Sequence, residues 1–168
     1  MAIQLRPAVP GDELEVAGVH VRSWQVGYRD LLPQASLDAM RPEDRAARYT
    51  FGDPDPTLPK TLVAVDDAVD GSIVGFIATR SIAAEPGKVL ALYVEPRHWG
   101  RGIGQVLIAA ARDRLAALGH REATLWLLEG NARGARFYAA DGWRPDGEHR
   151  VEALWGVQVS ELRYRRAL

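Results

Sequence analysis

Hydrophobic residues at the start of the chain recur with two different periods. Ile3 and Leu5 alternate with polar residues up to Pro7, which is typical of a short strand that ends at the proline. From Asp12 onward the apolar positions follow helical spacing, and Asp12 precedes Glu15 at the distance of a capping box. The pattern predicts an amphipathic helix to about Tyr28, with its apolar face at Leu14, Ala17, Val21, Trp24 and Tyr28.

The next segment is divided by prolines. A second helix is predicted from about Leu37 to Tyr49, with Pro42 inside it, after the break at Leu31–Pro33. The stretch Phe51–Pro59 then holds three prolines and a glycine in nine residues. Because proline lacks a backbone donor and fixes φ, this composition predicts a loop.

The remaining elements follow in an order typical of an α+β fold. Three successive strands are predicted over Thr61–Val65, Ser72–Ile82 and Lys88–Val94, and together they are expected to form an antiparallel meander. Helical spacing then runs from Gly102 to Gly119, which is placed to end the helix. A strand over Ala123–Leu128, a helix over Ala132–Ala140 and two strands near Trp143–Val151 and Ala153–Tyr164 complete the chain. We therefore expect a single domain over residues 1–168 with the order βααβββαβαββ. This is an α/β sandwich in which a mixed, mostly antiparallel sheet carries helices on both faces.

Composition and charge exclude several classes of function. The formal net charge of -1 lacks the basic excess of a general nucleic-acid binder, so no nucleic-acid partner is expected. The absence of cysteine leaves neither a disulfide nor a thiolate nucleophile. No apolar run is long enough to span a bilayer, and Met1–Arg6 lacks the features of a secretory signal. A cytoplasmic protein that needs no membrane and no metal is the resulting expectation.

Three glycines mark the point where an apolar strand meets the long helix. Gly100, Gly102 and Gly104 allow a phosphate to approach the backbone at a helix N-terminus, where unpaired N–H groups and the helix dipole favour an anion. The glycines are equally compatible with a plain strand-to-helix turn. The spacing does not fit a Rossmann fingerprint or a P-loop, because Gln105 stands where either motif needs another residue.

Two segments together carry a resemblance to a known family. The first is Pro96 followed by Gly100-Arg101-Gly102-Ile103-Gly104, and the second is Asn131-Ala132-Arg133-Gly134-Ala135-Arg136-Phe137-Tyr138 followed by Asp141-Gly142-Trp143. This arrangement resembles the GNAT superfamily of N-acetyltransferases, closely over about residues 60 to 145 and in element order over the whole chain. Trp99 stands where the family usually has Gln or Arg, and Gly134 where it usually has Ala.

The resemblance implies an acetyl-CoA site with named residues. Main-chain N–H groups of the loop would hold the CoA diphosphate, a segment that comprises Trp99, Gly100, Arg101, Gly102, Ile103, Gly104 and Gln105. Leu92, Tyr93 and Val94 would bind the pantetheine arm and polarise the thioester carbonyl, beside a splayed strand over Ala123–Leu128. Asn131 would bond the same arm, although it also suits a helix N-cap. Four arginines surround the two segments, and some of them are expected to contact the 3′-phosphate while most are solvated: Arg97, Arg101, Arg133 and Arg136.

The catalytic residues implied by the resemblance are fewer. Tyr138 matches the family tyrosine that protonates the leaving thiolate, while a core role suits the same residue. Glu129 is favoured as general base for its place at a strand end, ahead of Glu85, Glu95, His20 and His98. Without cysteine, direct attack of a primary amine in a ternary complex is expected.

The acceptor is expected near the N-terminal helices. Trp24 and Tyr28 share a helix face and either line an acceptor pocket or seal the core. The alternatives to acetyl transfer to a small molecule or peptide are a non-catalytic acyl-CoA sensor or scaffold and an enzyme that binds another phosphate ligand. The C-terminal strands, with Trp155, Val157 and Val159 on one face, make a homodimer conceivable.

Overall fold

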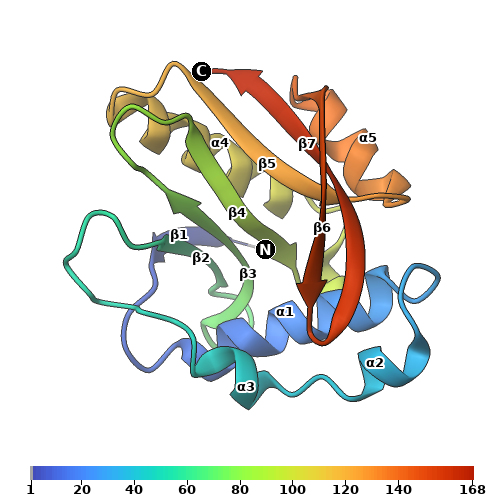
Figure 1. Cartoon of the computed structure of the whole chain (residues 1–168). Helices are drawn as coiled ribbons and strands as arrows, with labels where there is room; N and C mark the ends of the chain where they lie inside the picture. Colours follow the sequence, from blue (N-terminus) through green and yellow to red (C-terminus); the bar gives the residue numbers. More distant parts are fainter. Residues whose placement is uncertain (1) are drawn as a thin grey trace.

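A computed structural model describes residues 2–168 of the chain. These residues form a 7-stranded sheet in the order β1-β2-β3-β4-β5-β7-β6 (Figure 1). The strands are β1 (Ile3–Pro7), β2 (Lys60–Asp66), β3 (Ser72–Arg80), β4 (Gly87–Val94), β5 (Glu122–Leu128), β6 (Arg144–Leu154) and β7 (Val157–Ala167). β4 and β5 pair in parallel and the other neighbours pair antiparallel, so the predicted mixed, mostly antiparallel sheet is confirmed.

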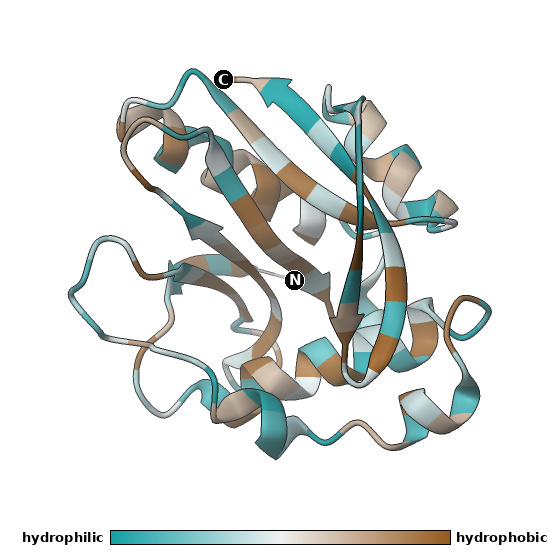
Figure 2. Cartoon of the chain, viewed as in Figure 1, coloured by the Kyte–Doolittle hydropathy of each residue, from teal (hydrophilic) through white to brown (hydrophobic). Residues whose placement is uncertain are grey.

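Helices cover both faces of the sheet, as predicted. α1 (Glu13–Gly27), α2 (Gln34–Asp38) and α3 (Pro42–Ala46) lie on one face, and α4 (Ile103–Ala117) and α5 (Ala132–Ala140) lie on the other (Figure 1). Apolar residues concentrate on the central strands between these layers (Figure 2). The largest cluster of buried residues packs α4 and α5 against the sheet, around Leu107, Trp143 and Tyr164.

Two of the sequence predictions about helices are wrong. The helix expected over Leu37–Tyr49 is two short helices, α2 and α3, because Pro42 begins α3 and fits only at a helix start. The element order is therefore βαααβββαβαββ. The capping box of α1 also fails to form. Asp12 accepts from Arg6 and from the main chain of Val9, and Glu15 accepts from the main-chain N–H of Ile73.

The C-terminal strands differ from prediction mainly in where the chain turns. β6 and β7 form one hairpin whose turn is Trp155-Gly156, later than the predicted break near Glu152, with both residues at positive φ. β6 is an edge strand of the sheet. The apolar face of β7 packs inward, since Val159 is buried and contacts the cluster around α1. A homodimer that pairs the free edge of β6 stays a prediction.

The feature of the sheet that positions the site is the divergence of β4 from β5. Only Gly87–Val89 pair with β5, opposite Ala123–Leu125, and the two strands then separate (Figure 1). Pairing with β3 shows the cause: Thr79 faces Val89 and Ala78 faces Ala91, so Leu90 is an extra residue in β4. Such a bulge bends a strand and interrupts its pairing. The later part of β4 therefore has no strand beside it on the β5 side within residues 2–168.

Candidate active site

A cavity of about 890 Å³ occupies the space between the diverging strands. Its walls come from β4, β5, the loop before α4, the start of α5, the α1 face and the β6–β7 hairpin. Most of the residues predicted to bind acetyl-CoA line it. They are Leu92, Tyr93, Val94, Trp99, Gly100, Gly102, Ile103, Gly104, Gln105, Asn131 and Arg133.

The glycine loop forms a cradle at the N-terminus of α4. Gly100 and Gly102 have φ values of 76° and 84°, which side-chain-bearing residues rarely adopt. A Cβ atom placed on either glycine would meet no atom within 4 Å, so the space above the loop is open. The first main-chain bond of α4 runs from Val106 to Gly102, which leaves the N–H groups of Ile103, Gly104 and Gln105 unused by the helix. A diphosphate fits such a cradle.

Trp99 connects three parts of this wall. Its Nε1 donates to the Val94 carbonyl at 2.7 Å, and the guanidinium of Arg133 lies 3.5 Å from the centre of its ring. The indole also lies against Gly27 at the end of α1. Trp99, one of the two residues that depart from the family pattern, therefore contacts β4, α1 and α5.

Asn131 serves as the N-cap of α5. Its side-chain oxygen accepts from the Gly134 N–H at 2.9 Å, which confirms the capping role. The departure at Gly134 has a steric reason, because a Cβ there would lie 2.7 Å from Asn131 Nδ2 and 2.8 Å from Leu127. Both residues line the cavity, so the amide of Asn131 is placed at its wall.

Tyr138 reaches the cavity from α5 through an aromatic layer. Its ring packs against Phe137, Trp143 and Tyr164, and the residue is 9% exposed. Burial, reinforced by the nearby Tyr93 and Asp141, raises the pKa of Tyr138 above its ordinary value of 10.0. The phenol is therefore a proton donor across the neutral and mildly alkaline range.

Three of the predicted site residues lie outside the cavity wall. Glu129, Arg101 and Arg136 are exposed and do not line the cavity. The other carboxylates considered as bases are engaged elsewhere: Glu95 is buried against Arg22, with contacts down to 2.8 Å, and Glu85 pairs with Lys88. Sequence position alone placed Glu129 beside Asn131, but its side chain turns to solvent.

Aromatic rings from several elements surround the other end of the cavity. Trp24 and Tyr28 line it, with ring centres 4.8 Å apart, and His20 stacks on Tyr93 at 4.5 Å. Trp155 from the hairpin turn lies 6.1 Å from Trp24. We call this set, His20, Trp24, Tyr28, Tyr93 and Trp155, the aromatic end. Trp24 is buried and also contributes to the cavity wall, and its role in an acceptor pocket stays a prediction.

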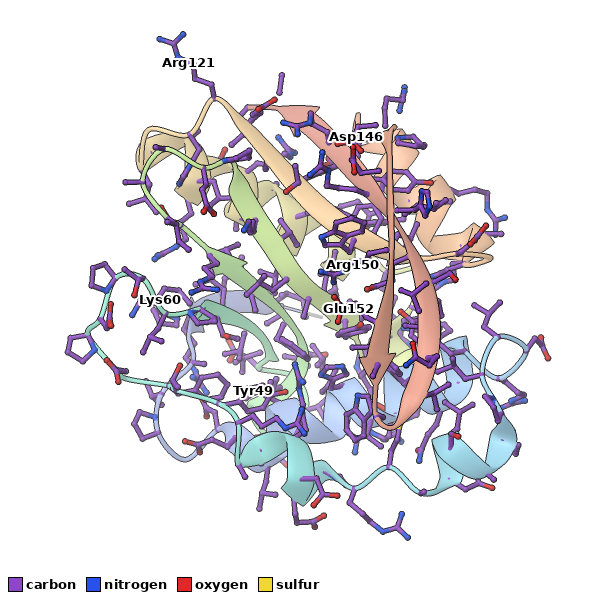
Figure 3. All side chains as sticks on the ribbon, in the orientation of Figure 1. Tyr49, Lys60, Arg121, Asp146, Arg150 and Glu152 are labelled. Atoms are coloured by element: carbon purple, nitrogen blue, oxygen red, sulfur yellow. The ribbon has the colours of Figure 1, made fainter. Side chains whose placement is uncertain are left out.

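The sequence did not predict the charged residues at the aromatic end. Glu161 on β7 lines the cavity, is 7% exposed and accepts from Arg150 Nε at 3.0 Å. Arg150 lies on β6 (Figure 3), and its guanidinium carbon is 4.4 Å from the centre of the Trp126 ring. Arg45 of α3 also lines the cavity. A signal existed for Glu161, because it shares one face of the strand with the apolar residues Val157 and Val159.

His20 is expected to make the fold less stable in mild acid. Burial and then the charge of Arg45 lower the pKa of His20 well below its ordinary value of 6.5. Below pH 6.5 the unfolded chain therefore binds a proton that the folded chain does not. The free energy of unfolding should fall as the pH drops, by up to about 1.4 kcal/mol per pH unit for this group. Urea unfolding of the wild type and His20→Leu at about pH 5 and about pH 7.5 measures the effect.

The matched control for this prediction is His149→Leu, at an exposed position of β6. The difference in unfolding free energy between the two pH values should shrink in His20→Leu and persist in His149→Leu. An unchanged pH dependence in His20→Leu would contradict the assignment.

Two further searches cover residues 2–168. No group of three or more His, Asp or Glu side chains is arranged to hold a metal ion there. No helix in the same residues has both the length and the apolar character needed to cross a bilayer.

Comparison with known proteins identifies the family. The model of the acetyltransferase (GNAT) family matches residues 21–143, well over half of the chain. The uncharacterized N-acetyltransferase YuaI of Bacillus subtilis is 26% identical over 95% of this chain and 90% of its own length. The mycothiol acetyltransferase of Clavibacter sepedonicus is 29% identical over 84% of this chain, which spans 50% of that relative.

Solved structures share the fold. The PaiA N-acetyltransferase of Thermoplasma acidophilum, solved in complex with coenzyme A, superposes with a TM-score of 0.74 at 21% identity over 100% of both chains. The glycine cradle, the divergent strands and these matches agree, and the chain belongs to the GNAT family of acetyl-CoA-dependent N-acetyltransferases.

Proposed function

We propose that this protein transfers the acetyl group of acetyl-CoA to a primary amine of a small molecule or peptide, by direct attack within a ternary complex. The observation that carries the proposal is one continuous cavity. The cavity connects the glycine cradle, Tyr138 and the aromatic end, so a diphosphate in the cradle and an acceptor amine at the other end can be bound at the same time. Holding both reactants in one cavity replaces a chance encounter with an oriented attack.

The cradle and the unpaired side of β4 would hold acetyl-CoA. The diphosphate would take the free N–H groups at the start of α4, and the pantetheine arm would lie along Leu92–Val94, beside Asn131. Arg133 lies over the Trp99 ring and lines the cavity, although the residue is exposed. Arg101 and Arg136 are exposed, so a contact with the 3′-phosphate would be made at the surface.

The chemical step needs two proton movements. The amine nitrogen attacks the thioester carbon, the nitrogen–carbon bond forms and the carbon–sulfur bond breaks. The nitrogen gives up one proton, for which we propose Glu161 as acceptor, since it is the carboxylate in the cavity wall. The departing thiolate takes one proton from the Tyr138 phenol. Glu129 remains the alternative base, at a position outside the wall.

The test of this function is acetyl-CoA-dependent thiol release in the presence of primary amines, followed with a thiol-reactive dye. The protein contains no cysteine, so it adds no background. Release with some amines and not without them is the expected result. Silence across amines, amino acids, aminoglycosides and peptide N-termini, with CoA still raising the melting temperature, would instead favour an acyl-CoA sensor.

Initial rates should show a sequential mechanism. The chain has no cysteine to carry the acetyl group, and we therefore expect both substrates to be bound before transfer. Reciprocal plots at several fixed amine concentrations should give lines that converge, and CoA should not be released before amine is added. Parallel lines and a burst of CoA without amine would contradict direct attack.

A further inference from the structure

The aromatic end of the cavity contains buried polar atoms that have no partner. Both ring nitrogens of His20, Nε1 of Trp24 and Nε of Arg45 are buried and make no hydrogen bond within residues 2–168. All three residues line the cavity. A buried polar group without a partner normally costs about 1–3 kcal/mol. These four atoms have almost no accessible surface, whereas the terminal nitrogens of the Arg45 guanidinium are not among the buried atoms and are the donors that a molecule in the cavity can meet.

The chemistry of these atoms defines what the molecule must present. Indole and guanidinium groups only donate hydrogen bonds, and a neutral imidazole donates from one nitrogen. His20 is neutral here, because burial and Arg45 keep its pKa low. The matching ligand group is therefore one with several acceptor oxygens.

The charge around Arg45 indicates that this group is anionic. No carboxylate of residues 2–168 lies within 4.0 Å of the Arg45 guanidinium, whose carbon atom Cζ lies 5.7 Å from the centre of the Tyr49 ring. Among the described lining residues, Glu161 alone has a carboxylate, and it is paired with Arg150. Arg45 is thus a cation that faces the cavity without a counter-charge.

Arg45 and Glu161 line the same cavity as Tyr93. Both charges act on its hydroxyl, since Arg45 lowers the pKa of Tyr93 and Glu161 raises it, within the larger upward shift caused by burial. A cation and a carboxylate near one tyrosine suit a molecule that carries both an amine and an anionic group. Its amine would point to Glu161 and its anion to Arg45.

We propose that the acceptor is an amine that also carries an anionic group, a carboxylate or a phosphonate, and that Arg45 is the residue that selects it. This inference rests on the proposed acetyl transfer and adds the class of acceptor. Arg45 acts on binding and discrimination, whereas proton transfer stays with Tyr138 and Glu161.

The experiment compares acceptors that differ only in the anion. Thiol release is measured with free L-amino acids, with the corresponding L-amino-acid amides, and with 2-aminoethylphosphonate against ethanolamine. Rates are expressed per concentration of unprotonated amine, because the amides are weaker bases. We expect kcat/KM for anionic acceptors to exceed that for the neutral partners by about 10- to 150-fold, the range of a charge-assisted hydrogen bond. The two anion types show whether a carboxylate or a phosphonate is preferred.

Variants assign the preference to Arg45. Arg45→Gln should abolish the discrimination through a higher KM for the anionic acceptor, and Arg45→Lys should restore part of it. Arg48→Gln is the matched control, because Arg48 follows α3, is exposed and does not line the cavity. The KM for acetyl-CoA should stay constant in all of them.

Each possible result either supports or overturns the proposed acceptor class. Equal rates for anionic and neutral acceptors, or an equal loss for both in Arg45→Gln, would overturn the proposal while leaving acetyl transfer intact. If no amine is acetylated although CoA binds, the proposed function fails instead. Melting temperatures measured with saturating CoA then test the acceptor class alone. Stabilisation by amino acids but not by amides, lost in Arg45→Gln, supports it, and equal shifts reject it.

Discussion

Replacing Tyr138 with phenylalanine is expected to lower kcat by about 100- to 10,000-fold and to leave the KM for acetyl-CoA nearly unchanged. The variant keeps the ring, and with it the contacts to Phe137, Trp143 and Tyr164. It loses only the hydroxyl that would give a proton to the departing thiolate. Because the proton is needed as the carbon–sulfur bond breaks, the loss should fall on the chemical step.

Two measurements separate this role from a structural one. Tyr164→Phe removes a hydroxyl from the same aromatic layer and should retain activity. In the wild type, kcat should show no alkaline loss up to about pH 10, because burial raises the pKa of Tyr138 above 10.0 and an acid is lost only as the pH passes its pKa. A Tyr138→Phe enzyme with full kcat would remove the residue from the mechanism.

Glu161→Gln is expected to lower kcat by about 100-fold or more at neutral pH, whereas Glu129→Gln should have little effect. The two substitutions are chemically identical and differ in place. Glu161 is buried in the cavity wall, and Glu129 is exposed outside it. Glutamine has nearly the shape of glutamate and an oxygen that can still accept from Arg150, so the change removes chiefly the ability to take up a proton.

The pH dependence distinguishes a lost base from a damaged site. As the pH rises, a growing fraction of the amine is already unprotonated, so the defect of Glu161→Gln should shrink in alkaline solution. A defect of constant size at every pH would indicate a structural role for Glu161. Loss of activity in Glu129→Gln together with a normal Glu161→Gln would make Glu129 the base.

The cradle end of the cavity, where we propose that acetyl-CoA binds, could be anticipated through the family resemblance, because the residues that carry this resemblance are close in sequence. The glycine cradle lies within one turn between a strand and a helix, and Asn131 and Tyr138 lie on one short helix. Local spacing fixes such geometry. The Asn131 cap followed from the sequence for the same reason.

The aromatic end, where we propose that the acceptor binds, could be anticipated only through Trp24 and Tyr28. Its other residues could not be anticipated in this way. It joins His20 from α1, Arg45 from α3 and Glu161 from β7, residues brought together only by the folded sheet. The error in the second helix contributed, because Arg45 was placed inside a continuous helix that Pro42 in fact divides. Glu129 shows the reverse case: closeness in sequence to Asn131 did not put its side chain in the cavity.

Because of the bulge at Leu90, the site depends on how many residues β4 contains rather than on which residue stands at this position. Leu90 is 48% exposed and belongs to no signature, so many side chains should be acceptable there. Removing the position would restore regular pairing along β4, let β5 follow it and close the space between them. A relative could thus keep every glycine, the asparagine and the tyrosine, yet lose the cavity between β4 and β5 through the deletion of one residue. The length of β4 is therefore as informative as the motifs when members of the family are sorted by activity.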